Sequence, residues 1–151
     1  MSWLRSLIVA LMLSVYAVGA VADDILMVRA RIPFAETMLA LQEAISAQGY
    51  KLSRVQRVDI GLTEFGFKTD KYRVVFFGKP DEIRDLAANH PELIPYLPLK
   101  IAIFAEETET LLVATNPTHL TAAYDDAELT RVFAHWADDL QVILEKVRQA
   151  E

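Results

Sequence analysis

Cysteine is absent from this 151-residue sequence. Without a thiol the chain has no disulfide, no thiolate metal ligand, no cysteine nucleophile and no lipid-modified cysteine as a membrane anchor. Small secreted domains often depend on disulfides, but a chain of this size buries about two-thirds of its unfolded surface and can fold without them. The lack of cysteine is therefore compatible with an oxidising compartment.

Positive charge is also scarce, with 15 Lys and Arg against 21 Asp and Glu and a net charge of −6. Nucleic acids and anionic membranes are bound through cationic surfaces, so neither is expected as a partner. No GxSxG elbow, phosphate-binding loop, HExxH motif or dinucleotide fingerprint is present. These absences favour a protein that binds a small anionic ligand or another protein over an enzyme.

Only one long stretch lacks charge, and it lies at the start of the sequence. Residues 7–22 contain no charged side chain, follow Arg5 and end in Ala20-Val-Ala22, the small-x-small pattern cut by signal peptidase. As a helix the stretch spans about 24 Å, against about 30 Å for a hydrocarbon core. We predict a signal peptide at 1–22 cleaved after Ala22, with an uncleaved anchor as the alternative. Cleavage leaves one domain, residues 23–151, periplasmic or secreted and with no stable membrane anchor.

Branched and aromatic residues gather in five segments bounded by Gly, Pro or Asn, which predicts five strands. The segments are Ile25–Ile32, Tyr50–Arg57, Tyr72–Phe77, Leu99–Phe104 and Thr110–Thr115. Residues 60–66 are expected to form a turn or a short helical piece, and residues 81–89 a short helix. Pro91, Pro95 and Pro98 prevent a long regular element in the connection that follows.

Two long helices are expected from apolar residues at helical spacing. The first carries Phe34, Met38, Leu41 and Ile45 on one face, with Gly49 placed to end it. The second contains eight such residues between 129 and 147, and Asp125 with Glu128 resembles a capping box at its start. The predicted order is β-α-β-β-β-β-α, an α+β fold with one mostly antiparallel five-stranded sheet and both long helices on one face.

The ionisable residues form no recognisable catalytic or metal constellation. His90, His119 and His135 are scattered, and the acids Glu106, Glu107 and Glu109 fall in a hairpin loop without the ligand spacing of a calcium site. We therefore predict no catalytic residue, metal or cofactor.

The segment from Phe76 to Ile101 is the strongest candidate for a site, because it combines breakers, lysines and an aromatic residue in loops. The predicted ligand-binding residues are Lys79, Pro80, His90, Tyr96, Pro98 and Lys100. One alternative is that the prolines only stiffen a crossover. A second is a small hydrolase or isomerase using His90 and a nearby carboxylate such as Glu92. A third is a purely structural dimer module.

At these residues the sequence resembles the domain-of-unknown-function 302 family. The resemblance rests on the strand 72–77 leading into Gly78-Lys-Pro80, on Leu97-Pro-Leu-Lys-Ile101, and on Asn116-Pro117 after the last strand. It implies a fold similar to the TATA-binding-protein-like β-α-β4-α arrangement, in bacterial proteins that are in some cases homodimers. Many relatives carry cysteine where this sequence has residues 78–80 and 98–100, so any thiol or soft-metal role cannot carry over.

The central strands carry large apolar side chains on both faces. Tyr72, Val74 and Phe76 alternate with Val75 and Phe77 along one strand. A sheet covered by helices on one face needs only one apolar face. We therefore predict a homodimer that buries part of the face without helices.

Overall fold

The computed structural model describes residues 24–150. The predicted signal peptide and its cleavage site after Ala22 lie outside the described residues. The elements follow in the order β1 (Ile25–Ala30), α2 (Phe34–Ala47), β2 (Lys51–Arg57), α3 (Val58–Glu64), β3 (Tyr72–Gly78), α4 (Pro80–Asn89), η2 (Pro91–Tyr96), β4 (Leu99–Ala105), β5 (Thr110–Thr115), η3 (Pro117–Ala122) and α5 (Ala127–Arg148). Within residues 24–150 no helix is long and apolar enough to span a bilayer.

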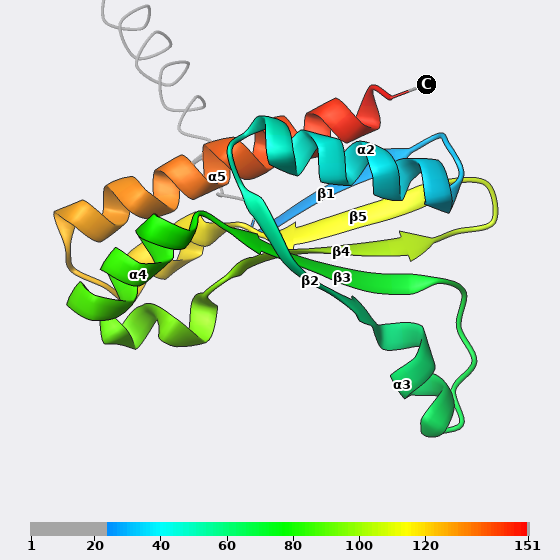
Figure 1. Ribbon diagram of the computed structural model, residues 1–151, viewed down its shortest axis with the longest axis horizontal. Helices are drawn as coiled ribbons and strands as arrows, with labels where there is room; N and C mark the ends of the chain where they lie inside the picture. The colour runs from blue at the N-terminus through cyan, green and yellow to red at the C-terminus, as the bar shows by residue number, and fades with distance from the viewer. Residues whose placement is uncertain (1–23, 151) are drawn as a thin grey trace, which may run out of the picture.

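The five strands form one antiparallel sheet in the order β1-β5-β4-β3-β2. Helices α2 and α5 lie on the same side of it (Figure 1). This confirms the predicted α+β fold, with a five-stranded antiparallel sheet and both long helices on one face. The sequence order β-α-β-β-β-β-α is also as predicted, with α3, α4 and two 3-10 helices inserted in the connections.

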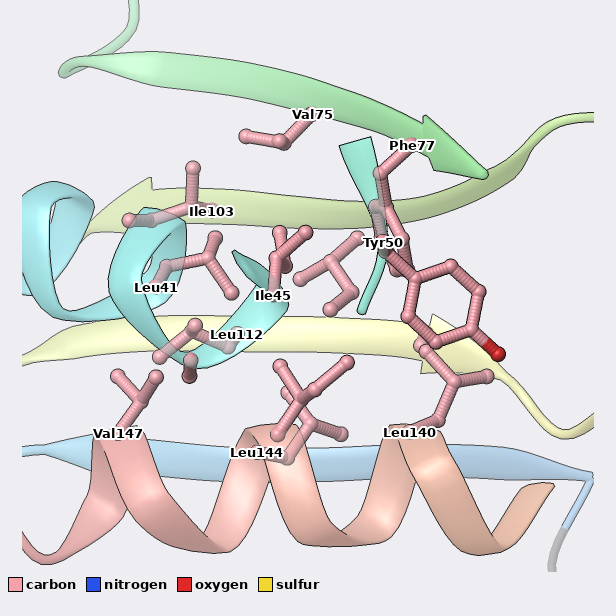
Figure 2. Packing of buried hydrophobic residues seen from close by; sticks show 14 of the residues in the cluster. Leu41, Ile45, Tyr50, Val75, Phe77, Ile103, Leu112, Leu140, Leu144 and Val147 are labelled. Atoms are coloured by element: carbon pink, nitrogen blue, oxygen red, sulfur yellow. The ribbon is translucent and has the colours of Figure 1, made fainter. Parts of the chain in front are cut away.

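The main core lies between the sheet and the two long helices. Leu41 and Ile45 of α2, and Leu144 and Val147 of α5, point toward the inner face of the sheet, where Phe77 is one of the fully buried residues (Figure 2). These helical residues follow the spacing of one apolar stripe on each helix. The sheet therefore has one face that the two long helices cover, except at its β2 edge, where Val55 is 41% exposed.

A smaller cluster lies beyond the end of the sheet, under α4, η2, η3 and the first half of α5. Its buried members are Leu86, Leu93, Leu120, Leu129, Phe133 and Trp136. Each of the short elements has only one or two buried side chains and cannot form a core alone. The first half of α5 supplies the common surface on which they pack, so this cluster holds the loops at that end of the molecule.

Three local predictions need correction. The first strand ends at Ala30 rather than Ile32, because the carbonyl of Ile32 accepts hydrogen bonds from the hydroxyls of Thr37 and Thr110 instead of continuing the ladder. The N-cap of α5 is Asp126, not Asp125, since the Asp126 side chain accepts from two backbone N–H groups of the first turn. The second strand begins at Lys51 rather than Tyr50, because the Tyr50 N–H still donates to the carbonyl of Ile45 at the end of α2, and a register shift between Leu52 and Arg54 interrupts its alternation.

Candidate functional site

A pocket of about 270 Å³ lies at the end of the sheet where β4 begins and β5 ends. Antiparallel pairing places these two strand ends side by side, so the connections leaving them meet there. One wall is the segment 95–100 that joins η2 to β4, and the opposite wall is the segment from Thr115 into η3. Trp136 and Leu140 of α5 form part of the lining on the helical side of the sheet.

The wall from η2 to β4 contains Tyr96, Pro98 and Lys100. The peptide bond between Leu97 and Pro98 is cis, and Pro95 lies inside the 3-10 helix. Proline fixes one backbone dihedral and removes a hydrogen-bond donor, so this connection has few alternative conformations. Tyr96 is packed edge-on against Tyr124, with 6.5 Å between the ring centroids.

The opposite wall is organised by Asn116 and Pro117. The Asn116 side chain caps η3 by accepting from the Thr118 backbone N–H at 3.1 Å and its hydroxyl at 2.9 Å. The backbone carbonyl of Asn116 lies 2.6 Å from His119 Nδ1, which fixes the imidazole beside the pocket. A polar residue followed by proline therefore starts a 3-10 helix here and also positions an ionisable ring.

The chemistry of the lining is mostly apolar, with one ammonium group from Lys100 and one imidazole from His119. The indole N–H of Trp136 donates to Glu82 of α4 at 3.3 Å, so this buried polar atom is already satisfied. No carboxylate belongs to the described residues that line the pocket. Such a lining suits a compact apolar ligand that carries one negative charge.

Of the six predicted site residues, the fold brings Tyr96, Pro98 and Lys100 together in this pocket. The other three, Lys79, Pro80 and His90, are not among its lining residues. Pro80 is the exposed first residue of α4, where its missing N–H costs no helical hydrogen bond.

Lys79 takes part in a separate polar cluster at the start of α4. Its Nζ atom lies 3.3 Å from Asp139 Oδ2 and 4.3 Å from the centre of the Tyr50 ring. The Tyr50 hydroxyl donates to the same oxygen of Asp139 at 2.7 Å, and His135 Nε2 lies 3.4 Å from it. Burial, together with the neighbouring carboxylate, raises the pKa of Tyr50. The cluster joins β3, α5 and the start of β2.

His90 follows the last residue of α4, and its Nδ1 lies 3.4 Å from Glu92 Oε1. This separation is longer than the 2.6–3.2 Å, or thereabouts, of a productive proton-transfer contact. The Glu92 side chain is 47% exposed, and neither residue lines the pocket. The geometry therefore gives the hydrolase or isomerase alternative little support.

His119 and Trp136 are pocket residues that sequence reasoning did not select. Trp136 is one of the eight apolar residues between 129 and 147 that predicted the last helix, and it is buried. The motif Asn116-Pro117 marked the end of a strand but gave no indication that η3 would face the connection before β4. That proximity follows from the pairing of β4 with β5 and is not visible in either loop alone.

The acidic hairpin between β4 and β5 is held by Arg29 of β1 and by Arg31, just after that strand. Glu106 forms a two-point ion pair with Arg29, at 2.8 and 3.1 Å, and Glu109 lies 3.9 Å from Arg31. The Arg29 guanidinium lowers the pKa of Glu106. Across residues 24–150 there is no group of three His, Cys, Asp or Glu side chains placed to hold a metal ion.

A solved structure described as an uncharacterized conserved protein DUF302 from Bacillus stearothermophilus is similar to this chain, with a TM-score of 0.75 and 22% sequence identity. The likeness covers 84% of this chain and 100% of the other. At this level of identity it establishes the fold. No curated protein matches the sequence.

The family model for the domain of unknown function DUF302 matches residues 26–148. The match runs from β1 to the end of α5 and so includes every element described above. It also confirms the family resemblance found in the order of the short sequence motifs. The chain therefore belongs to the DUF302 family.

Proposed function

We propose that this protein is a non-enzymatic binding module for a small, mostly apolar molecule with one anionic group, such as a carboxylate. The observation that supports it most is the convergence of Tyr96, Pro98 and Lys100 with His119 and Trp136 around one pocket. Tyr96, Pro98 and Lys100 were predicted from the sequence as ligand-binding residues, before their proximity to the other two was known. Stiff proline-bearing walls favour binding, because less conformational freedom is lost when a ligand is held.

The volume of the pocket limits the size of the ligand that it can hold. Its volume of about 270 Å³ is slightly below the range of about 300–1,000 Å³ typical of pockets for drug-sized molecules. An aromatic or short aliphatic carboxylate fits this volume and matches the lining. Its ring or chain would contact Trp136 and Tyr96, and its carboxylate would pair with Lys100.

The ionisable groups that line the pocket favour a binding function over a catalytic one. The Nδ1 atom of His119 is next to a backbone carbonyl, and no lining carboxylate is available to orient or charge the ring. A general acid–base mechanism needs such a positioned partner for the proton it moves. Lys100 is exposed and so keeps the hydration typical of a lysine that pairs with anions.

We further propose that the protein acts in the periplasm or outside the cell after cleavage behind Ala22. The apolar stretch after Arg5 and the Ala20-Val-Ala22 pattern support this. N-terminal sequencing of the protein isolated from its host should give Asp23 as the first residue. Recovery of the chain from the membrane with Met1 retained would contradict it.

The pocket can be tested by tryptophan fluorescence. The sequence contains two tryptophans, Trp3 and Trp136, and only Trp136 remains in residues 23–151. Titration with benzoate or hexanoate should change its emission, whereas benzamide and hexanamide should bind more weakly. The substitution Lys100→Gln should weaken carboxylate binding about tenfold, equivalent to about 1.4 kcal/mol, and Tyr96→Ala should weaken acid and amide alike.

A suitable control is Lys51→Gln, which removes an exposed lysine of β2 that is not among the pocket residues. It should leave the affinity unchanged. The absence of any spectral change or NMR shift with all four probes at millimolar concentration would contradict the proposed function. Equal effects of Lys100→Gln and Lys51→Gln would show that the anion does not bind at this pocket.

A further inference from the structure

Strand β1 forms an open edge of the described sheet, because it pairs with β5 on one side only. A hydrogen bond next to it shows which backbone groups face outward: the Asn116 N–H donates to the carbonyl of Asp24 at 2.8 Å. In an antiparallel ladder, opposite residues alternate between pairs that exchange both hydrogen bonds and pairs that exchange none. The register places Asp24 opposite Asn116, so the even-numbered residues of β1 are bonded to β5. The N–H and C=O groups of Ile25, Met27 and Arg29 therefore point away from the sheet, and within residues 24–150 they have no backbone partner.

A groove of about 830 Å³ runs beside this edge, between β1 and α5. The strand and the helix are in contact and lie side by side in Figure 2. Three apolar side chains that line the groove are exposed: Ile25 at 56%, Met27 at 52% and Val142 at 49%. The open strand edge thus lies next to apolar side chains that a further strand would cover.

The other edge of the sheet, β2, carries features that oppose strand addition. A register shift between Leu52 and Arg54 interrupts its ladder, and the cationic side chains of Lys51 and Arg54 are exposed. Bulges and exposed cations are the means by which proteins prevent pairing at a sheet edge. Strand β1 has a continuous register, and its one cation, Arg29, is in an ion pair with Glu106. Of the two edges, β1 is therefore the one suited to accept another strand.

We propose that an extended segment of a partner protein, with apolar residues at alternate positions, adds to the sheet along β1. Its backbone pairs with the outward groups of Ile25, Met27 and Arg29. Half of its side chains enter the groove beside α5, and the other half extend the helix-free face. In strand addition of this kind, backbone hydrogen bonds give affinity and the alternate side chains give specificity.

A second copy of this chain fits the groove less well than a separate peptide. In a continuous sheet of two copies, both α5 helices would lie on the same side. The side chains of β1 on that side, Leu26 and Val28, already pack against the core of their own molecule. A second β1 would therefore bring a helix to the groove and no free side chain to fill it. An extended peptide brings free side chains and no helix.

The charges of the groove favour one acidic residue in the partner segment. Lys146 lines the groove in the last turn of α5, is exposed, and forms no ion pair with any described residue. The other charged lining residue, Glu145, is already paired with Arg148, whose Nε lies 2.7 Å from it. A carboxylate on the groove side of the partner strand can therefore pair with Lys146.

Fluorescence anisotropy tests this site with residues 23–151, which include every described element. The probe is the labelled peptide Ser-Val-Thr-Val-Thr-Glu-Ser, whose two valines and glutamate lie on one side of an extended strand. Replacing its glutamate with glutamine should weaken binding to the wild type about threefold, but should have no effect with Lys146→Gln. The absence of any anisotropy change at millimolar protein would overturn the proposal.

N-methylated probes test the backbone hydrogen bonds without changing the protein. One probe is methylated at the nitrogens of the two valines and the glutamate, and the other at those of the two threonines and the last serine. The apolar alternation fixes which set of N–H groups faces β1. One probe should therefore lose affinity about tenfold or more, and the other should bind nearly as well as the parent. Equal losses would overturn the proposal.

The substitution Met27→Pro tests the same hydrogen bonds from the side of the protein. It removes an outward N–H and leaves the ladder to β5 intact, because proline is tolerated on an edge strand where the N–H faces solvent. The affinity for the parent probe should fall about tenfold. Met27→Ala is the matched control, since it keeps the N–H and should weaken binding less. Circular dichroism checks that both variants are folded.

Amide hydrogen exchange locates the added strand. In the wild type, the N–H groups of Leu26 and Val28 should exchange slowly and that of Met27 rapidly, because only the first two are bonded to β5. Addition of the probe should slow exchange at Met27. Binding of the probe with unchanged exchange at Met27 would place it elsewhere and overturn the proposal.

Self-association through the same edge would also overturn the proposal. Sedimentation velocity without peptide would then show a dimer that Met27→Pro converts to a monomer. The proposed function is tested separately with benzoate, because the groove and the ligand pocket share no lining residue. Failure of the probe with intact benzoate binding would contradict strand addition alone, and the reverse result would contradict the proposed function alone.

Discussion

Asp139 is the residue on which the polar contacts of three elements meet. One carboxylate oxygen accepts from Tyr50 and lies within ion-pair distance of Lys79 and His135. A carboxylate that is largely removed from solvent, as Asp139 is, needs such partners to remain charged. Lys79 is therefore better explained as a member of this cluster than as a ligand-binding residue.

The contribution of this cluster can be measured with Tyr50→Phe. The substitution keeps the ring and removes the hydroxyl that donates to Asp139 at 2.7 Å. A hydrogen bond to a charged group is worth about 1.5–3 kcal/mol, so the free energy of unfolding should fall by about that amount in urea titration. No change would mean that Lys79 and His135 satisfy Asp139 without Tyr50.

Asp126 has a separate role as the cap of α5. Its Oδ1 accepts the backbone N–H of Leu129 at 3.0 Å and that of Glu128 at 2.7 Å. These two hydrogen bonds lower the pKa of the Asp126 carboxyl. Because the pKa of this carboxyl is lower in the folded state, its ionised form stabilises the folded protein fully above about pH 3.9, the ordinary aspartate value. This stabilisation is lost as the pH falls through the lower pKa of the folded state.

Two substitutions distinguish the contribution of the hydrogen-bond acceptor of Asp126 from the contribution of its negative charge. Asp126→Ala should lower the melting temperature by roughly 3–6 °C at pH 7, because two N–H groups lose their acceptor. Asp126→Asn keeps the acceptor and should lower it less. The difference between the wild type and Asp126→Asn should shrink as the pH falls below about 4, since only the wild type titrates there. A difference independent of pH would contradict this account of the cap.

At the scale of elements, the end of α2 depends on one backbone conformation. Gly49 has φ of +77°, and the N–H groups of Gly49 and Tyr50 donate to the carbonyls of Ser46 and Ile45. This is the Schellman arrangement, in which a left-handed residue follows the helix. Tyr50 and Ile45 also belong to the same core, so the turn sets the position at which β2 begins.

The substitution Gly49→Ala should cost about 1–2 kcal/mol in unfolding free energy, because a Cβ in the left-handed region meets the backbone. A Cβ at this position would have its nearest neighbour, the Cε of Lys79, 3.9 Å away, so lack of space is not the cause. Asn tolerates this conformation better, and Gly49→Asn should therefore cost less. Equal costs in urea titration would point to a cause other than backbone conformation.

The sequence predicted those elements whose signals are local. The strand Thr110–Thr115 has the predicted bounds, and α5 follows the spacing of its apolar residues. The start of α5 was misplaced by one residue because Asp125 and Asp126 are both good caps and only backbone geometry separates them. Of the residues that line the candidate pocket, Tyr96 and Lys100 lie close together along the chain and could be selected from the sequence, whereas His119 is brought to them only by the pairing of β4 with β5.

At the scale of the whole molecule, the cluster around Phe133 joins the pocket walls to the rest of the fold. Phe133 is fully buried and packs with Trp136 at 5.9 Å between ring centroids. Helices η2 and η3, which carry the two walls, pack on this cluster and not on the main core. The pocket therefore depends on α5 for its shape as well as for two of its lining residues.

Phe133→Ala should lower the free energy of unfolding by about 3–5 kcal/mol and also weaken the binding of benzoate. Val142→Ala is a matched control on the same helix, since Val142 is half exposed and should change stability by about 0.5 kcal/mol or less. Thermal unfolding and fluorescence titration measure the two effects. Loss of stability with unchanged benzoate affinity would contradict the link between this cluster and the pocket.

Strand β1 cannot pair with β5 until almost the whole chain has been made, because β5 lies near the other end of the sequence. In the described sheet β1 pairs only with β5, and even its nearest partners, Ala30 and Thr110, are 80 positions apart. Each of the other strands pairs with the next one along the chain. Closing so long a loop is entropically unfavourable early in folding, so β2 to β5 should associate first and β1 should add last. A chain that emerges from a ribosome or an export channel N-terminus first thus has an unpaired apolar strand for most of that time, a segment that chaperones can hold.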